Sequence, residues 1–70
     1  MGFYCQRAVD RLTCAQQVRL PHAMAALYLA EATAALRNAI RERELESDLV
    51  RTADAMAQAA ARLANKWSKG

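Results

Sequence analysis

Glycine and proline, the two residues that most disfavour a helix, are nearly absent from this chain of 70 residues. Its glycines are Gly2 and Gly70, and its single proline is Pro21. Seventeen residues are alanine, which has the highest helix propensity of all residues. The sequence therefore predicts an all-α protein that folds as one domain over residues 1–70.

The same alanines limit the hydrophobic core, because alanine buries little apolar surface. Apolar residues make up 54% of the chain, which argues against intrinsic disorder, but few of them are large. Each large side chain contributes about 1.5 to 3 kcal/mol when fully buried, whereas each ordered residue costs about 1.5 kcal/mol of conformational entropy. Because these contributions nearly cancel in a single chain, we expect a homo-oligomer, in the simplest case a dimer, to complete the fold.

Pro21 marks the clearest boundary between helices, because proline cannot donate a backbone hydrogen bond and restricts the residue before it. Upstream, apolar residues recur at steps of three and four from Cys5 to Ala15, which predicts a short amphipathic helix over about 3–19. Proline suits the first position of a helix, so a second helix is expected over about 21–43.

The segment from residue 41 to 48 contains no glycine or proline, and one continuous helix from about 22 to 66 is an open alternative. Against it, the line of apolar residues along the helix, which we call the apolar seam, continues from Ile40 to Leu45. This step of five residues would shift the seam by about 140° around a continuous helix. Ser47 is suited to cap a new helix, and Asp48 suits its first turn. We prefer a turn near residues 43–47 and an antiparallel hairpin whose second arm spans about 48–66.

Alanine repeats follow both long helices. The first repeat has a period of seven and consists of Ala25, Ala32 and Ala39. The second has steps of three and four and consists of Ala53, Ala57, Ala60 and Ala64. Small residues let helix axes come close together, so the sequence predicts that these two alanine faces pack against each other.

Seven residues form the candidate surface for binding a second copy or another protein: Met24, Tyr28, Ala32, Ala39, Met56, Ala60 and Trp67. They combine alanines, which allow close approach, with bulky and aromatic side chains, which anchor many interfaces. For Trp67 we prefer the interpretation of a cap that covers the helix ends, with an exposed anchor for a partner as the alternative. The leading hypothesis is a noncatalytic protein-protein interaction module, an adaptor, chaperone-like or inhibitor protein that self-associates and binds a protein partner through helix faces.

Catalysis is not expected, since the sequence shows no set of converging reactive groups. His22 is the only histidine, and no nucleophile or orienting carboxylate can be assigned to it. With glycine only at Gly2 and Gly70, a phosphate-binding loop is excluded in practice. We therefore expect neither enzymatic activity nor a cofactor.

Cys5 and Cys14 lie nine residues apart in one predicted helix, which places them on opposite sides and about 13 Å apart along the axis. This separation is too large for an internal disulfide, so we expect reduced thiols. One alternative function is a ligand or metal sensor that uses Cys5, Cys14 and His22, although their spacing is not typical of a metal site.

Basic residues indicate another alternative, a nucleic-acid-binding regulator that uses Arg37, Arg41 and Arg43 near the predicted turn. The net charge is only +3, and acidic residues alternate with these arginines. A solvated tip with salt bridges is the preferred interpretation, so nucleic acid is not the expected partner.

Charged residues also interrupt the most apolar helix, at Glu31 and Arg37, before it reaches the length of a membrane span. We therefore expect no membrane partner. The first residues lack the basic and apolar regions of a secretory signal, and a cytoplasmic location is expected.

Overall fold

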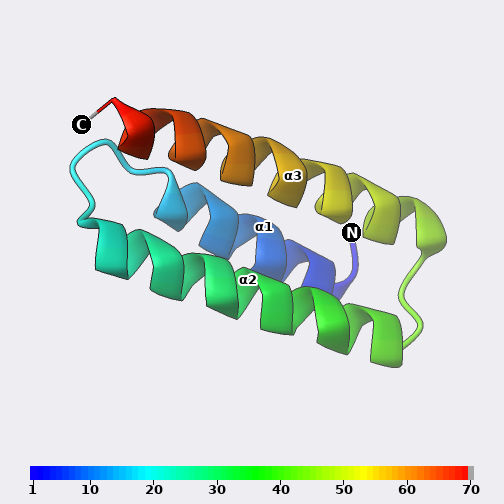
Figure 1. Cartoon of the computed structure of the whole chain (residues 1–70). Coiled ribbons are helices and arrows are strands. Elements are labelled where there is room, and N and C mark those ends of the chain that lie inside the picture. Colours follow the sequence, from blue (N-terminus) through cyan, green and yellow to red (C-terminus); the bar gives the residue numbers. More distant parts are fainter. Residues whose placement is uncertain (70) are drawn as a thin grey trace.

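The computed structural model describes residues 1–69, which form three α-helices and no strand. Helix α1 spans Phe3–Ala15, α2 spans His22–Arg41 and α3 spans Glu46–Ser68. Each helix runs opposite to the one before it (Figure 1). The first helix packs against both long helices, and more extensively against α2 than against α3.

The bundle is elongated, with principal extents of 39, 17 and 14 Å. The prediction of an all-α chain, with a shorter helix followed by two long ones, is confirmed. No helix within residues 1–69 combines the length and the apolar character needed to cross a bilayer.

Helix α1 buries the side expected from its sequence, but it ends at Ala15 rather than near residue 19. Its buried residues are Cys5, Ala8, Leu12 and Ala15. In the loop that follows, Lys66 Nζ donates hydrogen bonds to the carbonyl groups of Gln17 (3.3 Å) and Val18 (2.8 Å). The chain reverses direction before Pro21, and a helix through residue 19 would leave too few residues for that reversal.

Pro21 occupies the N-cap position of α2, with φ of −59° and ψ of 147°. Its carbonyl accepts hydrogen bonds from the N–H groups of Met24 and Ala25, both at 3.0 Å. The helix therefore begins at His22, one residue later than predicted.

A tight turn over residues 42–45 separates α2 from α3, so the alternative of one continuous helix from 22 to 66 is wrong. Arg43 has a φ of 56°, in the left-handed region, which costs roughly 1 to 2 kcal/mol for a residue with a side chain. The N–H of Arg43 donates to the carbonyl of Ile40 (3.1 Å), and that of Glu44 donates to the carbonyl of Ala39 (3.0 Å). These are the two bonds of a Schellman motif, in which glycine usually holds the position of Arg43. The motif ends α2 at Arg41, two residues before the predicted end.

Helix α3 begins at Glu46, two residues earlier than predicted, and ends at Ser68 rather than near 66. The prediction that Ser47 caps this helix is wrong, because Leu45 holds the cap position. The carbonyl of Leu45 accepts hydrogen bonds from the N–H groups of Asp48 and Leu49, both at 3.0 Å. Ser47 consequently falls inside the first turn, where Asp48 was expected and is found.

Alanine dominates the core. Seven of the ten buried apolar residues within 1–69 are alanine, and the other three are Cys5, Leu12 and Leu63. One cluster joins Leu12 to alanines of all three helices, and a second cluster joins Ala15, Ala25 and Leu63. The core of a single chain is therefore small, with few large side chains fully enclosed.

The two alanine faces do not meet, contrary to the prediction. The repeat on α2 is buried: Ala25, Ala32 and Ala39. The repeat on α3 is exposed: Ala53, Ala57, Ala60 and Ala64. Helix α3 instead buries the neighbouring side that carries Thr52, Ala59 and Leu63. The reason is that α1, which has small residues of its own, occupies the place beside α2 that the prediction assigned to α3.

Candidate interaction surface

Large apolar side chains are more numerous on the surface of residues 1–69 than in the core. The two that are buried are Leu12 and Leu63. Eight others have between 41% and 84% of their surface exposed: Met1, Phe3, Val18, Met24, Leu27, Ile40, Leu45 and Val50. Exposed apolar surface is a candidate for contact with another molecule.

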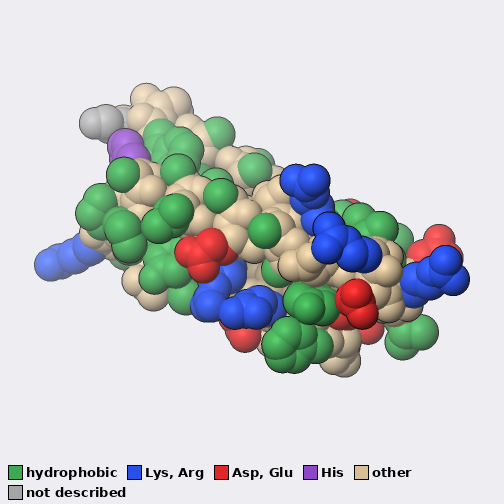
Figure 2. All heavy atoms as spheres, turned by 90° about the horizontal axis from the view of Figure 1, so that it is seen from below, with side chains coloured by type: hydrophobic (Ala, Val, Ile, Leu, Met, Phe, Trp, Pro, Cys, Tyr) green, Lys and Arg blue, Asp and Glu red, His purple; other side chains and the backbone are tan. Residues whose placement is uncertain are grey.

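These eight residues lie on several sides of the bundle. On the face shown in Figure 2, hydrophobic side chains gather near the end that carries the histidine, and charged side chains separate them from the opposite end. Met24 and Leu27, both exposed, belong to the first half of α2. No single face accounts for all of the exposed apolar residues.

The seven residues predicted to form an interaction surface are divided by the fold. Ala32 and Ala39 are completely buried within the chain, so a partner does not reach them while the bundle stays closed. The other five are at least partly exposed: Met24, Tyr28, Met56, Ala60 and Trp67. Binding through these five stays a prediction.

Trp67 covers the apolar cluster at one end of the bundle. It is half-buried and packs against Ala15, Ala25 and Leu63. Its ring centroid lies 5.2 Å from that of His22, with the ring planes at 43°. Its indole Nε1 is buried and has no hydrogen-bond partner among residues 1–69. This placement favours the interpretation of Trp67 as a cap and gives His22 an aromatic neighbour.

An apolar face runs along the outside of α3. It consists of Val50, Ala53, Ala57, Ala60 and Ala64, all exposed, and we call it the outer face of α3. The steps of three and four place these side chains on one side of the helix.

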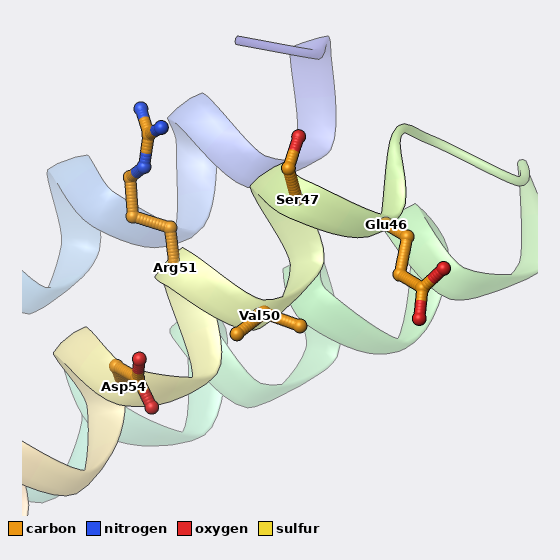
Figure 3. Close-up of a pocket in the computed structure, with 5 residues that line it drawn as sticks. All are labelled: Glu46, Ser47, Val50, Arg51 and Asp54. Atoms are coloured by element: carbon orange, nitrogen blue, oxygen red, sulfur yellow. The ribbon is translucent and has the colours of Figure 1, made fainter.

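A shallow depression lies at the start of the outer face of α3. It is lined by Glu46, Ser47, Val50, Arg51 and Asp54, whose side chains project from the first turns of the helix (Figure 3). Val50 lies between Glu46 and Asp54 in this view. The depression therefore combines an apolar centre with two carboxylates and one guanidinium group.

The arginines of the alternative nucleic-acid hypothesis, Arg37, Arg41 and Arg43, are all exposed near the α2–α3 turn. The salt bridges predicted for this tip are not formed. The ion pair found within residues 1–69 joins Arg11 to Glu31 at 3.0 Å, between α1 and α2. Such an exposed pair contributes about 0 to 1 kcal/mol.

Glu44 makes a contact that the sequence did not reveal. Its carboxylate accepts hydrogen bonds from the backbone N–H groups of Tyr4 (2.8 Å, to Oε2) and Cys5 (3.0 Å, to Oε1). These N–H groups belong to the first turn of α1, where they have no partner within the helix and where negative charge is favourable. Burial raises the pKa of Glu44, but the hydrogen bonds lower it more, so the pKa lies below its ordinary value of 4.5.

Gly2 makes room for this carboxylate. A Cβ atom at position 2 would collide with the side chain of Glu44. We call Gly2, the N–H groups of Tyr4 and Cys5, and the Glu44 carboxylate the α1 clasp. No local sequence signal could have identified it, because the two sides of the clasp are 40 residues apart.

Both cysteines are free thiols, in agreement with their separation along α1. Cys5 is fully buried, and burial raises the pKa of its thiol, whereas Cys14 is half-buried. No group of three His, Cys, Asp or Glu residues within 1–69 is arranged to hold a metal ion. The fold therefore does not bring Cys5, Cys14 and His22 together as a metal site.

Comparison with known proteins identifies no relative of this chain: no family model, no curated protein and no solved structure matches it. A function must therefore be inferred from the surfaces and contacts described above.

Proposed function

We propose that this chain is a noncatalytic helical interaction module that associates with a second copy of itself and binds another protein through exposed helix faces. The observation that carries the proposal is the distribution of large apolar side chains. Two are buried, whereas eight are at least 41% exposed. Exposed apolar side chains that lie near one another, such as Met24 and Leu27 on α2, offer surface that a partner can bury.

The small core supports the same proposal. A chain of this length is close to the limit of independent stability, and any partner that binds only the folded form stabilises it by mass action. Covering one large side chain contributes at most about 1.5 to 3 kcal/mol, whereas association costs roughly 4 to 15 kcal/mol. A partner must therefore cover several exposed residues at once, which favours contact through a helix face over a single anchoring residue.

Sedimentation velocity and thermal unfolding, each measured over a range of protein concentrations, test self-association. We expect the average mass to rise above that of one chain at micromolar concentrations, and the melting temperature to rise with concentration. A chain that stays monomeric, with a melting temperature independent of concentration, would exclude self-association.

Capture from the native host tests the binding of another protein. The baits are the wild type and a variant in which Met24 and Leu27, both exposed on α2, are replaced by glutamate. A protein retained by the wild type and lost by the variant supports binding through this part of α2. Equal capture by both baits excludes this surface, and the absence of any captured protein argues against a stable partner.

A further inference from the structure

The antiparallel hairpin of α2 and α3 (Figure 1) has one side that is covered and one that is free. Helix α1 covers the first side, where Glu31 of α2 pairs with Arg11, and Arg62 of α3 donates a hydrogen bond to the C-cap residue of α1 (3.1 Å). Thr33 lies about 160° around α2 from Glu31, and Ala53 lies about 180° around α3 from Arg62. Both are exposed. We call the side that carries them, opposite α1, the free side of the hairpin.

Large apolar side chains lie along the middle of the free side. On α2, Ile40 is 58% exposed and Leu36 is half-buried, and on α3 both Leu49 and Met56 are half-buried. Ile40 lies about 40° around α2 from Leu36, and Leu49 lies about 20° around α3 from Met56, so each pair shares one side of its helix. A single chain encloses these side chains only in part, and a second layer of helices on the free side would complete their burial.

Small residues lie beside these large ones on both helices. On α2 they form an exposed row, the outer face of α2, which consists of Ala26, Ala30, Thr33 and Arg37. Followed backwards from Ala64 to Ala53, the outer face of α3 has the same steps of four, three and four. The hydroxyl of Thr33 donates to the carbonyl of Leu29 (3.0 Å), so covering it leaves no unpaired donor. The two outer faces can therefore meet in antiparallel orientation with closely spaced axes.

The charged residues at these two faces are basic on α2 and acidic on α3. Arg37 lies on the outer face of α2 with Arg41 one turn beyond it, whereas Glu46 and Asp54 lie at the start of the outer face of α3. Glu46 is within about 20° of Ala57 around the helix, so it stands on the face itself, and Asp54 is about 60° to one side. Within residues 1–69 these four charged side chains form no ion pair. Antiparallel contact between the two outer faces brings the basic end of one beside the acidic end of the other.

The depression in Figure 3 has a shape and a charge that fit the end of α2. Val50 lies between the carboxylates of Glu46 and Asp54, and the guanidinium group of Arg51 points away from Val50. A fitting partner therefore presents a guanidinium group beside an aliphatic side chain. The end of α2 offers this combination in Arg37, Ile40 and Arg41.

We propose that a second copy of this chain binds the free side of the hairpin, with α2 of each copy antiparallel to α3 of the other and a two-fold axis along the bundle. Such an axis keeps the copies level, and Leu29 and Ala59 of one chain are level because Leu29 packs against the cluster that contains Ala59. Ala30 of one copy therefore lies opposite Ala60 of the other.

The same register places Arg37 of one copy beside Asp54 of the other, and Arg41 beside Glu46. Each contact is made twice, because the arrangement is isologous. Pairing α2 with α2 instead would set these arginines against alanines of the second copy and leave Glu46 unpaired. The inference rests on the proposed self-association and adds the surface, the helix pairing and the register.

Disulfide trapping tests the helix pairing. Facing Cα atoms of helices whose axes are about 8 to 10 Å apart are separated by about 3.5 to 5.5 Å, which overlaps the range for a disulfide. Ala30→Cys and Ala60→Cys are each made together with Cys14→Ser, and Cys5 is retained because it is fully buried. When the two variants are unfolded, mixed and refolded, we expect mild oxidation to join them in a covalent heterodimer. Each variant alone should cross-link at least about tenfold more slowly, because like helices lie diagonally across the assembly.

Gln58→Cys in the same background is the matched control for Ala60→Cys, since it is exposed but lies about 160° around α3 from Ala60. We expect its mixture with Ala30→Cys to cross-link as slowly as the single variants. If the wild type sediments as a dimer, equal yields from the two mixtures, no cross-link in either, or rapid cross-linking of Ala60→Cys with itself would overturn the helix pairing and leave self-association standing. A wild type that is monomeric throughout would overturn both.

Charge reversal, followed by sedimentation, tests the same contact independently. We expect Arg37→Glu and Asp54→Arg each to raise the dissociation constant of the dimer by roughly threefold to thirtyfold at low salt, since each change disrupts two symmetry-related pairs of exposed charges. The double variant should return to within about threefold of the wild type, because it restores opposite charges. Arg7→Glu is the matched control, since Arg7 is exposed on α1, away from the second copy. Additive weakening in the double variant, or an equal effect of Arg7→Glu, would overturn the proposed contact.

Discussion

The alanine faces of α2 and α3 have similar sequences and opposite environments. Ala25, Ala32 and Ala39 of α2 are buried, whereas the alanines of the outer face of α3 are exposed. Both repeats show that another helix can come close, but neither specifies which helix does so. A small-residue face therefore allows a close contact, and the rest of the fold selects the helix that makes it.

Helix α1 occupies the α2 face because it is held at both of its ends. At its start, the α1 clasp binds its first N–H groups to the carboxylate of Glu44 in the α2–α3 turn. Just beyond its end, Lys66 of α3 donates hydrogen bonds to carbonyl groups of the α1–α2 loop. Within residues 1–69, the outer face of α3 is exposed and is not covered by α1.

Replacing Ala32 with leucine should produce the largest effect. Ala32 is completely buried in a cluster with Ala8 and Leu12, so extra methyl groups must displace well-packed neighbours. We expect Ala32→Leu to lower the free energy of unfolding by about 1 to 3 kcal/mol. Urea unfolding followed by circular dichroism measures this change. A variant as stable as the wild type would show that α1 does not close the α2 face.

Glu44→Gln should lower the melting temperature at neutral pH, because it keeps the shape of the side chain but removes the negative charge that binds the start of α1. Glu42→Gln is a matched control, since Glu42 is exposed in the same turn. Differential scanning calorimetry compares the two variants. If both shift the melting temperature equally, the effect belongs to the charge of the turn and not to the clasp.

The contribution of Glu44 should disappear in acid. Its pKa in the folded chain lies below the ordinary value of 4.5, so the clasp stabilises the fold above the unfolded pKa, and this stabilisation is lost as pH falls through the folded pKa. We expect the stability difference between wild type and Glu44→Gln to be largest near neutral pH and to vanish in strong acid. Urea unfolding of both proteins from about pH 7 down to about pH 2 measures it. A difference that stays constant with pH would contradict an ionised clasp.

Ala60→Leu should have the smallest effect on a single chain. Ala60 is exposed on the outer face of α3, and surface substitutions usually change stability by less than about 0.5 kcal/mol. The measurement is urea unfolding at a concentration where sedimentation shows a monomer, with Ala32→Leu unfolded beside it. A loss as large as that of Ala32→Leu would show that both alanine faces are buried and would remove the contrast between them.

Much of the fold follows from local properties of the sequence. The helices follow from the abundance of alanine and the scarcity of glycine and proline, and Pro21 locates the start of α2 to within one residue. The buried side of α1 follows from the spacing of its apolar residues. The turn after Ile40 follows from the change of face in the apolar seam, although its Schellman geometry does not, because Arg43 holds the position of the usual glycine.

Which alanine face is buried and which carboxylate binds α1 depend on how the three helices pack together. Periodicity identifies the residues that share a side of a helix, but burial also depends on the neighbour, and three helices can be paired in more than one way. In the same way, Glu42, Glu44 and Glu46 are equivalent in a local reading of the sequence. The geometry of the turn brings the carboxylate of Glu44 to the first N–H groups of α1. These groups have no partner within the helix, so the carboxylate accepts their hydrogen bonds.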